Sequence, residues 1–364
     1  MFRFIISLIF SLSLSYSVTL INRFKVPVYV SVSTSIGYDE NFLRLSPSDI
    51  KFANKFPSIM SDSKSTNTMV NRNNIGLEYG PYLFKDHETR VKLNLSRNLY
   101  ESLSEKSYNK YSLSISQHLG PYKWLKFNYS LMPDYYLRNY LDNDIREIIY
   151  FNNSEDIPPC ISCKTASFSQ EEKSIEYTMS DSRINKVWYS MYYSIKAQYY
   201  NENFNEFNLE IKKFKVGVSS KYSKSKKFGF KISYSIANNI TKLLDQFSTA
   251  NNDRGYNSTI INLSFSDRVK KSIINNYGWS FILENRNFTS QMTLDHLHYG
   301  RRDSDIKTSF WIDKHLKKET SLKIGINFRK KFSNSNYKFV EEIKSFSKYD
   351  IWVKYTFKTE LLPY

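Results

Sequence analysis

The sequence predicts an all-β protein, a transmembrane antiparallel up-and-down β-barrel of about 14 strands, within a range of roughly 12 to 16. Three observations predict it: a basic and apolar N-terminal stretch typical of exported proteins, long segments in which apolar and polar residues alternate, and abundant aromatic side chains. Aromatic residues make up 16% of the 364 residues, with 29 Tyr and 26 Phe, which excludes a disordered chain. The mean hydropathy of −0.51 excludes a helical membrane bundle.

The N-terminus has the three parts of a secretory signal peptide. Arg3 provides a basic start, residues 4–15 are apolar or hydroxylic, and Ser15-Tyr16-Ser17 is a small-x-small triplet suited to cleavage after Ser17. The apolar part is too short for a membrane-spanning helix, which takes about 20 residues. We therefore expect residues 1–17 to be a signal peptide and residues 18–364 to form one barrel domain. The alternative for this stretch is a buried N-terminal strand.

Beyond the N-terminal stretch, apolar residues recur at every second position. In one example, Phe228, Phe230, Ile232, Tyr234 and Ile236 alternate with Lys231, Ser233 and Ser235. Period 2 over such a length indicates a strand with one apolar and one polar face. The segments run about 10 to 15 residues, whereas globular strands average about 5 or 6 and a tilted membrane strand needs about 9 to 11. Apolar side chains are expected to face lipid, and polar ones the lumen.

The alternation places strands near residues 28–38, 72–83, 88–99, 108–119, 123–139, 168–180, 187–200, 204–222, 227–237, 255–267, 274–288, 303–316, 319–332 and 346–358. The longest gaps follow odd-numbered strands, as expected when short periplasmic turns alternate with longer outer loops. The tight gap at 201–203 departs from this rhythm. The apolar parity shifts around Lys212 and Lys213, where a β-bulge is expected. The alternative fold is a soluble exported β-sandwich, whose strands are shorter and whose loops do not alternate in length.

The chain is strongly basic, with a formal net charge of +17 from 52 Lys and Arg against 35 Asp and Glu. Such a charge fits attraction to nucleic acid, anionic lipid or an anionic solute, and it also follows from the AT-rich codons of residues such as Lys. The sequence has no recognition-helix pattern, RNA-binding motif or zinc finger, so we expect no nucleic-acid partner.

The strand phase directs basic side chains into the lumen. The expected lumen-facing basic residues are Arg90, Lys92, Lys126, Lys196, Lys231, Lys323 and Lys354. Glu78, Glu210 and Glu284 are expected on the same face. Because inward Lys and Arg favour anions in a pore, the sequence predicts a porin-like channel for passive passage of small solutes, with an anion preference. The alternative is that these side chains pair with acids and water and fill a closed lumen.

Two cysteines, Cys160 and Cys163, form a C-x-x-C pair in a predicted outer loop. Such a pair can be redox-active, bind a metal or form a local clip. Covalent haem attachment needs His after the second Cys, where Lys164 stands. In an exported loop a local disulfide is expected, because that environment is oxidising. We predict no metal and no cofactor.

The segment Asp295-His296-Leu297-His298-Tyr299 brings His close to a carboxylate in another predicted outer loop. A His–carboxylate pair is a reasonable general base, and outer-membrane proteases of the omptin type carry Asp and His on barrel loops. Such a site also needs a second acidic pair, for which Asp142 and Asp144 are candidates by composition alone. The alternatives are two solvated loop histidines or a weak metal site, and we expect no enzyme.

The 39–71 segment is long and rich in Ser, Asn and Lys, with Phe42, Phe52 and Phe56. It fits either a constriction or plug folded into the lumen, or an outer loop that binds a partner. A plugged lumen predicts a different function, a non-conducting surface or assembly barrel that acts through its outer loops on a protein partner.

The first predicted strand ends in Ile36-Gly37-Tyr38-Asp39-Glu40-Asn41, followed by Phe42 and Arg44. This resembles the Gly-Tyr-Asp-x-Asn opening of many Gram-negative outer-membrane barrels. The C-terminal third is similar to the C-terminal barrel of surface lipoprotein assembly modifiers and related uncharacterised barrels, on the motifs Asn285-Arg286-Asn287-Phe288, Gly300-Arg301-Arg302-Asp303 and Ser333-Asn334-Ser335-Asn336-Tyr337. Unlike those modifiers, this sequence shows no helical repeat domain before the barrel, and it continues to Tyr364 beyond the in-register aromatic Phe357. The resemblance implies location in the bacterial outer membrane, contact with outer-membrane lipid and insertion by the barrel assembly machinery.

Overall fold

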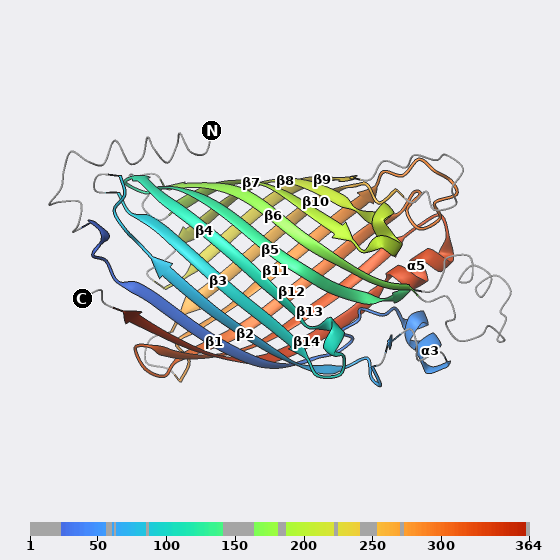
Figure 1. The fold of residues 1–364 in the computed structure, drawn as a ribbon, viewed down its shortest axis with the longest axis horizontal. Helices are drawn as coiled ribbons and strands as arrows, with labels where there is room; N and C mark the ends of the chain where they lie inside the picture. The colour runs from blue at the N-terminus through green and yellow to red at the C-terminus, as the bar shows by residue number, and fades with distance from the viewer. Residues whose placement is uncertain are drawn as a thin grey trace.

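The computed structural model describes residues 23–55, 60–61, 63–84, 87–140, 164–180, 187–221, 225–240, 253–269 and 273–361. In these residues fourteen strands form one closed antiparallel barrel, in which each strand pairs with its neighbours in the chain and β14 pairs back onto β1 (Figure 1). The strands are β1 (Val28–Asp39), β2 (Thr68–Tyr79), β3 (Thr89–Tyr100), β4 (Tyr108–Gly120), β5 (Lys123–Tyr140), β6 (Lys164–Ser180), β7 (Val187–Tyr200), β8 (Leu209–Lys221), β9 (Lys227–Asn239), β10 (Tyr256–Arg268), β11 (Asn276–Phe288), β12 (Arg302–His315), β13 (Thr320–Asn334) and β14 (Phe346–Leu361). The predicted fold is confirmed.

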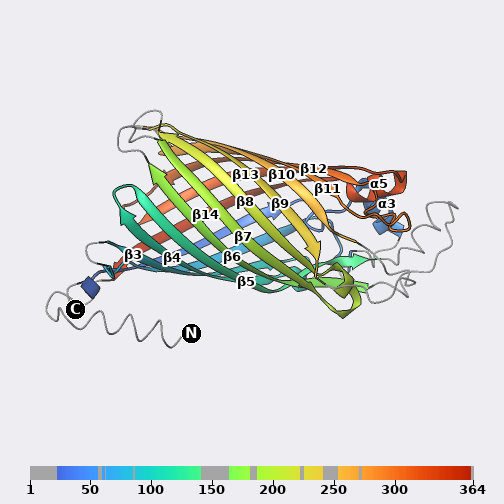
Figure 2. The same ribbon diagram turned by 90° about the horizontal axis from the view of Figure 1, so that it is seen from above.

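The alternating pattern gives the wall two chemically different faces. On β9, Phe230, Ile232 and Tyr234 are exposed on the outward face, while Ser233 and Ser235 are buried on the inward face. The same alternation recurs on the other strands, and all of them are steeply tilted (Figures 1 and 2). A closed barrel leaves no unpaired strand edge, so its wall satisfies the hydrogen-bonding demand of hydrocarbon.

The outward face is too apolar for contact with water alone. Its exposed large side chains include Ile36, Ile75, Leu93, Leu95, Phe127, Ile175, Met191, Phe214, Phe230, Phe310, Ile326, Ile351 and Val353. A continuous apolar surface of this kind around a polar interior is the signature of an outer-membrane barrel. The protein therefore lies in the bacterial outer membrane, with lipid against its outward face. No helix of the described residues is long and apolar enough to cross a membrane.

Three predicted strands begin four or five residues away from their predicted starts. β6 begins at Lys164 instead of residue 168. β2 runs from Thr68 to Tyr79 instead of 72–83, and β8 begins at Leu209 instead of residue 204. The shift in β8 arises because the 3₁₀ helix η3 (Glu202–Phe207) occupies the start of the predicted strand. The connection from β7 to β8 therefore spans 201–208 and is not the tight gap expected from the sequence.

The β-bulge expected at Lys212 and Lys213 is also wrong. The pairing of β8 with β7 and β9 runs without a register shift, so Lys212 points outward and Lys213 inward. Glu210, expected in the lumen, also faces outward and forms an ion pair of 3.1 Å with Lys212. Both charged residues lie near the outer end of β8, where the apolar alternation gives way to charge. The described register shifts lie instead in β4 and β5.

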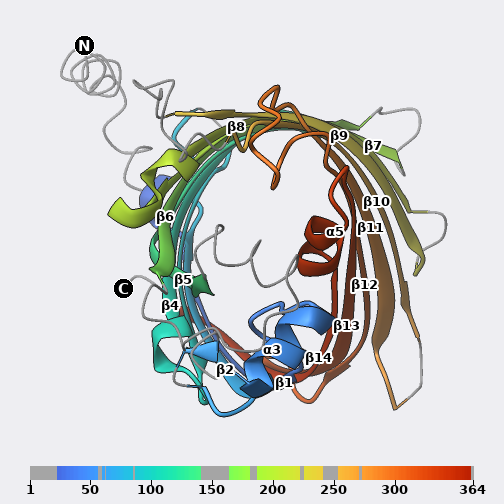
Figure 3. The ribbon, with the colours of Figure 1, turned by 90° about the vertical axis from the view of Figure 1, so that its right-hand side faces the viewer.

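Two helices lie inside the ring of strands when the barrel is viewed along its axis (Figure 3). Helix α3 (Pro47–Lys55) belongs to the β1–β2 connection, and α5 (Lys338–Lys344) to the β13–β14 connection. Both lie at the end of the barrel opposite the start of β1 and the end of β14; we call this the outer end (Figure 1). The α3 cluster contains Phe42, Leu43, Leu45, Ala53, Met60, Leu103 and Tyr136, and the α5 cluster contains Phe339, Val340 and Ile343. The described part of the 39–71 segment thus folds into the barrel mouth.

A tight turn after β1 directs the chain into the mouth. Asn41 adopts a φ of 54°, which Asn tolerates better than most residues. Its side-chain oxygen accepts a hydrogen bond from the Leu45 backbone N–H (2.7 Å), and its amide donates to the carbonyls of Leu45 (2.8 Å) and Ser347 (2.9 Å). The following Phe42 is 2% exposed. The Gly-Tyr-Asp-x-Asn motif therefore ends the first strand and seats the loop against β14.

Candidate solute pathway through the barrel

All seven predicted basic residues have the inward parity of their strands. Arg90 and Lys92 lie on β3, Lys126 on β5, Lys196 on β7, Lys231 on β9, Lys323 on β13 and Lys354 on β14. On each strand the alternate positions carry the exposed apolar side chains. These seven residues do not share one environment, because some are paired with acids and others are not.

Arg90 and Lys92 belong to a compact ion-pair cluster near the inner end of the barrel. The Arg90 guanidinium lies 2.8 Å from Glu88 and 3.4 Å from Glu78, and Lys92 lies 3.7 Å from Glu78. The guanidinium also lies 5.0 Å from the ring centroid of Trp124. For Arg90 and Lys92, the structure therefore fits the alternative in which basic residues pair with acids, and not the one in which they act as free cations of a pore.

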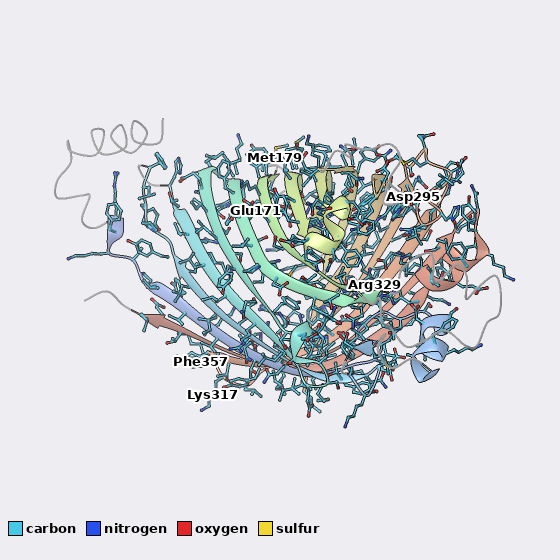
Figure 4. All side chains as sticks on the ribbon, turned by 45° about the vertical axis from the view of Figure 1, so that its right-hand side comes forward. Glu171, Met179, Asp295, Lys317, Arg329 and Phe357 are labelled. Atoms are coloured by element: carbon cyan, nitrogen blue, oxygen red, sulfur yellow. The ribbon has the colours of Figure 1, made fainter. Side chains whose placement is uncertain are left out.

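The inward face formed by β11–β14, β1 and β2 carries a network of alternating acids and bases, which we call the paired wall. Its ion pairs are Arg286–Glu284 (2.8 Å), Lys307–Asp305 (3.4 Å), Arg329–Asp305, Lys331–Asp303 (2.8 Å), Lys348–Asp39 and Arg72–Asp350 (3.4 Å). Figure 4 labels Arg329 within this network. Because the charges of this network have opposite partners, the network contributes little net field to the lumen. Lys323 and Lys354 lie on the same inward face but outside the network.

The opposite inward face, formed by β5–β9, is unbalanced, and we call it the lysine wall. Between the strand ends, its inward lysines are Lys126, Lys196, Lys213, Lys215 and Lys231. None of these forms an ion pair with a described residue. The inward acids there are Glu172 and Glu176, so five positive charges face two negative ones and leave a balance of +3. Lys213 and Lys215 were missed by the sequence analysis because the parity of β8 was misassigned.

Lys126 and Lys196 lie in register with the two acids, Glu176 and Glu172, whereas the cross-strand partners of Lys213 and Lys215 all carry hydroxyl groups. Lys213 pairs in register with Ser194 and Ser235, and Lys215 pairs with Tyr192 and Ser233. The Lys215 ammonium lies 3.9 Å from the Tyr192 ring centroid. Opposite charges placed directly across a strand pair would stabilise the sheet, and β8 lacks them at these two positions.

An ion pair holds α3 against β5 at the mouth. The Arg138 guanidinium lies 2.8 Å from Asp49, and the two side chains are 7% and 2% exposed. Beside them, Lys106 in η2 (Ser104–Lys106) donates hydrogen bonds to the carbonyls of Tyr136 (2.6 Å) and Leu137 (3.0 Å). Burial, with nearby cations adding to it, lowers the pKa of Lys106 well below its usual range. The described part of the β1–β2 segment is thus fixed to the wall at the barrel mouth.

The Asp295–His298 pair is structural in this fold, so the expected solvated histidines are wrong for His298. His298 is 5% exposed, and its Nδ1 lies 2.8 Å from Asp295. Asp295 also accepts a hydrogen bond from the Asp253 backbone N–H (2.9 Å), which ties the β9–β10 and β11–β12 connections together. The imidazole packs on Phe207 and Phe288, so it is shielded from bulk water. Figure 4 shows Asp295 at the outer end of the barrel.

The other candidate residues predicted from the sequence do not form a catalytic or metal site in the described part of the chain. The candidate residues outside the described chain are the predicted signal peptide at 1–17, Phe56, Asp142, Asp144, Cys160 and Cys163. Within the described residues, no group of three or more His, Cys, Asp or Glu is placed to hold a metal ion. His296, the other loop histidine, packs against Tyr337 with ring centroids 4.5 Å apart.

The buried histidine predicts that the outer loops loosen in acid. Burial, followed by the nearby Arg301 and Arg254 charges, lowers the pKa of His298 to about 4, although Asp295 opposes the shift. The folded state therefore favours neutral imidazole. Its stabilising contribution is complete above about pH 6.5 and is lost as the pH falls towards 4, by about 3 kcal/mol in total.

We expect hydrogen exchange of residues 289–301, corrected for intrinsic rates, to accelerate between pH 7 and pH 5. His298→Gln stays neutral and serves as the control, because it should lose this part of the pH dependence. Equal pH dependence in both proteins would contradict the assignment.

Comparison with known proteins finds solved structures of low similarity. No family model and no curated protein matches the chain. Among solved structures, OmpT of Vibrio cholerae in its trimer form has a TM-score of 0.48 at 6% identity, covering 91% of this chain and 98% of that one. The outer membrane channel DcaP of Acinetobacter baumannii has a TM-score of 0.44 at 10% identity, covering 91% and 96%.

CdiB from Acinetobacter baumannii also has a TM-score of 0.44, at 9% identity over 91% of this chain, which spans 60% of the CdiB chain. The resemblance of the C-terminal third to surface lipoprotein assembly modifiers stays a prediction. The chain is similar, at low identity, to Gram-negative outer-membrane β-barrels. Its solutes and partners must therefore be inferred from its own residues.

Proposed function

We propose that this protein is a porin-like outer-membrane channel for passive passage of small solutes, with a preference for anions. One observation carries the proposal: the lysine wall has five inward ammonium groups that form no ion pair with a described residue, across the lumen from a wall on which most charges are paired. Inward cations in a low-dielectric barrel raise the local concentration of anions and favour their passage.

The arrangement of the two walls supports a path along one side of the lumen. On the paired wall, basic side chains already form ion pairs with acids. For example, Asp303 lies between Arg301 (3.2 Å) and Lys331 (2.8 Å). On the lysine wall, the neighbours of Lys213 and Lys215 are hydroxyl groups, which solvate an anion without competing for the ammonium. Away from Lys323 and Lys354, an anion therefore gains more along β5–β9 than along the ion-paired network of β11–β14.

The second candidate is the non-conducting surface or assembly barrel. The observation that favours it is the position of α3 and α5 inside the ring of strands, with α3 fixed by the Asp49–Arg138 ion pair (Figure 3). A barrel sealed at its mouth would present the outer loops to a protein partner. Transport assays separate the two candidates directly.

Solutes of equal size and different charge test the proposal. Swelling of liposomes that contain the refolded protein should be fastest in gluconate, slower in glucose and slowest in glucosammonium, each at the same osmolarity. The expected order follows from the balance of +3 on the lysine wall. The reverse order would contradict the anion preference, and no swelling with protein that is folded and inserted would favour the second candidate.

A further inference from the structure

Glycine and tryptophan alternate in one inward-facing row across five neighbouring strands. Gly278 on β11 pairs with Trp311 on β12, which pairs with Gly325 on β13. Gly325 pairs with Trp352 on β14, and Trp352 pairs with Gly37 on β1. The row uses three of only ten glycines in the chain. It runs obliquely from the inner end of β11 to the middle of β14.

The glycines allow the two indole rings to lie flat against the wall. A Cβ on Gly325 would lie 2.4 Å from Cζ2 of Trp352, and one on Gly278 would lie 2.6 Å from Cζ2 of Trp311. Each ring therefore covers the backbone of the glycine beside it, which no other residue type permits without displacing the ring. The outcome is a pair of aromatic surfaces that face the lumen.

One lysine serves both rings. The Lys323 ammonium lies 3.9 Å from the ring centroid of Trp311 and 5.9 Å from that of Trp352. The ammonium therefore lies over the Trp311 ring and at the edge of contact with the Trp352 ring. Lys354, two residues after Trp352, lies on the same inward face. Asp313 lies across from Lys323 in register, but neither lysine forms an ion pair with a described residue, so both ammonium groups can accept an anionic ligand.

We propose that Trp311, Trp352 and Lys323 form a binding site for small planar aromatic carboxylates inside the channel. The ligand ring stacks on the Trp352 indole, and its carboxylate accepts hydrogen bonds from the Lys323 ammonium. The row itself offers glycine and indole, with no side-chain amide or hydroxyl to satisfy the many hydroxyls of a sugar. This inference rests on the proposed function, because it assumes an anion-preferring channel and specifies that the transported anions carry an aromatic ring.

Calorimetric titration of the refolded protein in detergent measures the site without requiring an open pore. The probes are benzoate, cyclohexanecarboxylate, glucuronate and acetate. We expect benzoate to bind about tenfold more tightly than either of the two non-aromatic ring acids, and acetate to bind weakest, because only benzoate can both stack and pair.

Substitutions assign the effect to the row. Trp352→Leu and Lys323→Gln should each weaken benzoate binding about tenfold, and Gly325→Ala should weaken it because the added Cβ lifts the Trp352 ring. Trp188→Leu is the matched control, because Trp188 is an inward tryptophan on β7, far from the row. Folding of every variant is checked by its heat-dependent migration in gels.

Benzoate that binds no tighter than acetate, or Trp352→Leu that behaves like Trp188→Leu, would overturn the proposal. Glucuronate that binds as tightly as benzoate would overturn the assignment to aromatic acids. Conductance separates this site from the proposed function. Binding by a protein without conductance would reject the channel and keep the site, and conductance without benzoate binding would do the reverse.

Discussion

Arg138→Ala is expected to raise the single-channel conductance and to make it noisier, because the substitution releases α3 from the barrel wall. The Asp49 carboxylate is 2% exposed and would stay buried without the guanidinium that lies 2.8 Å away. Removing one partner of a buried ion pair costs about 3 to 5 kcal/mol. The lower value alone reduces the equilibrium constant for docking of α3 by a factor of roughly 100. Planar-bilayer recordings at fixed voltage measure the effect.

The matched control for this substitution is Lys173→Ala. Lys173 forms an ion pair of the same type with Glu171 (3.0 Å), but it points outward and is 70% exposed. Because this pair lies outside the lumen and does not contact α3, its loss should leave the conductance unchanged. A folded Arg138→Ala barrel with wild-type conductance and noise would show that α3 does not constrict the pathway.

Replacing Lys196, Lys213 and Lys215 together with glutamine is expected to abolish most of the anion preference. The three substitutions remove three positive charges from a wall whose balance is +3, which leaves it neutral. The zero-current potential across a KCl gradient should therefore move towards the value of an unselective pore. Glutamine is similar in length to lysine, so a change in the zero-current potential would come from the lost charge and not from a change in pore diameter.

An outward triple variant, Lys173→Gln with Lys212→Gln and Lys330→Gln, removes the same charge from the lipid-facing side of the barrel. It should leave the zero-current potential close to that of the wild type, because those charges do not line the lumen. Equal shifts in the two triple variants would attribute the selectivity to overall charge and contradict the role of the lysine wall.

The barrel could be predicted from the sequence because period 2 depends only on neighbours in the chain. The boundaries of β3, β5 and β7 lie close to the predicted ranges for this reason. β8 was less predictable, because the aromatic residues of η3, such as Phe204 and Phe207, resemble the start of a strand. An outward Lys212 paired with Glu210 also imitates a change of parity without any bulge.

The site could be predicted only in part, since its chemistry depends on which strands meet. The inward direction of Lys196 or Lys231 follows from alternation alone. Whether an inward base meets an acid depends on register, as with Asp303 and Lys331 on β12 and β13. The direction of the 39–71 segment depends on Asp49 and Arg138, which are 89 residues apart in the chain. The Gly–Trp row requires the register of five strands at once.

The central claim is that an open lumen with an unbalanced lysine wall conducts anions in preference to cations. The most direct test is the zero-current potential of the refolded wild-type protein in a planar bilayer across a KCl gradient. Stable open steps with a potential of the sign set by chloride are expected. A potential of the sign set by potassium, or silence from protein shown to be folded and inserted, would contradict it.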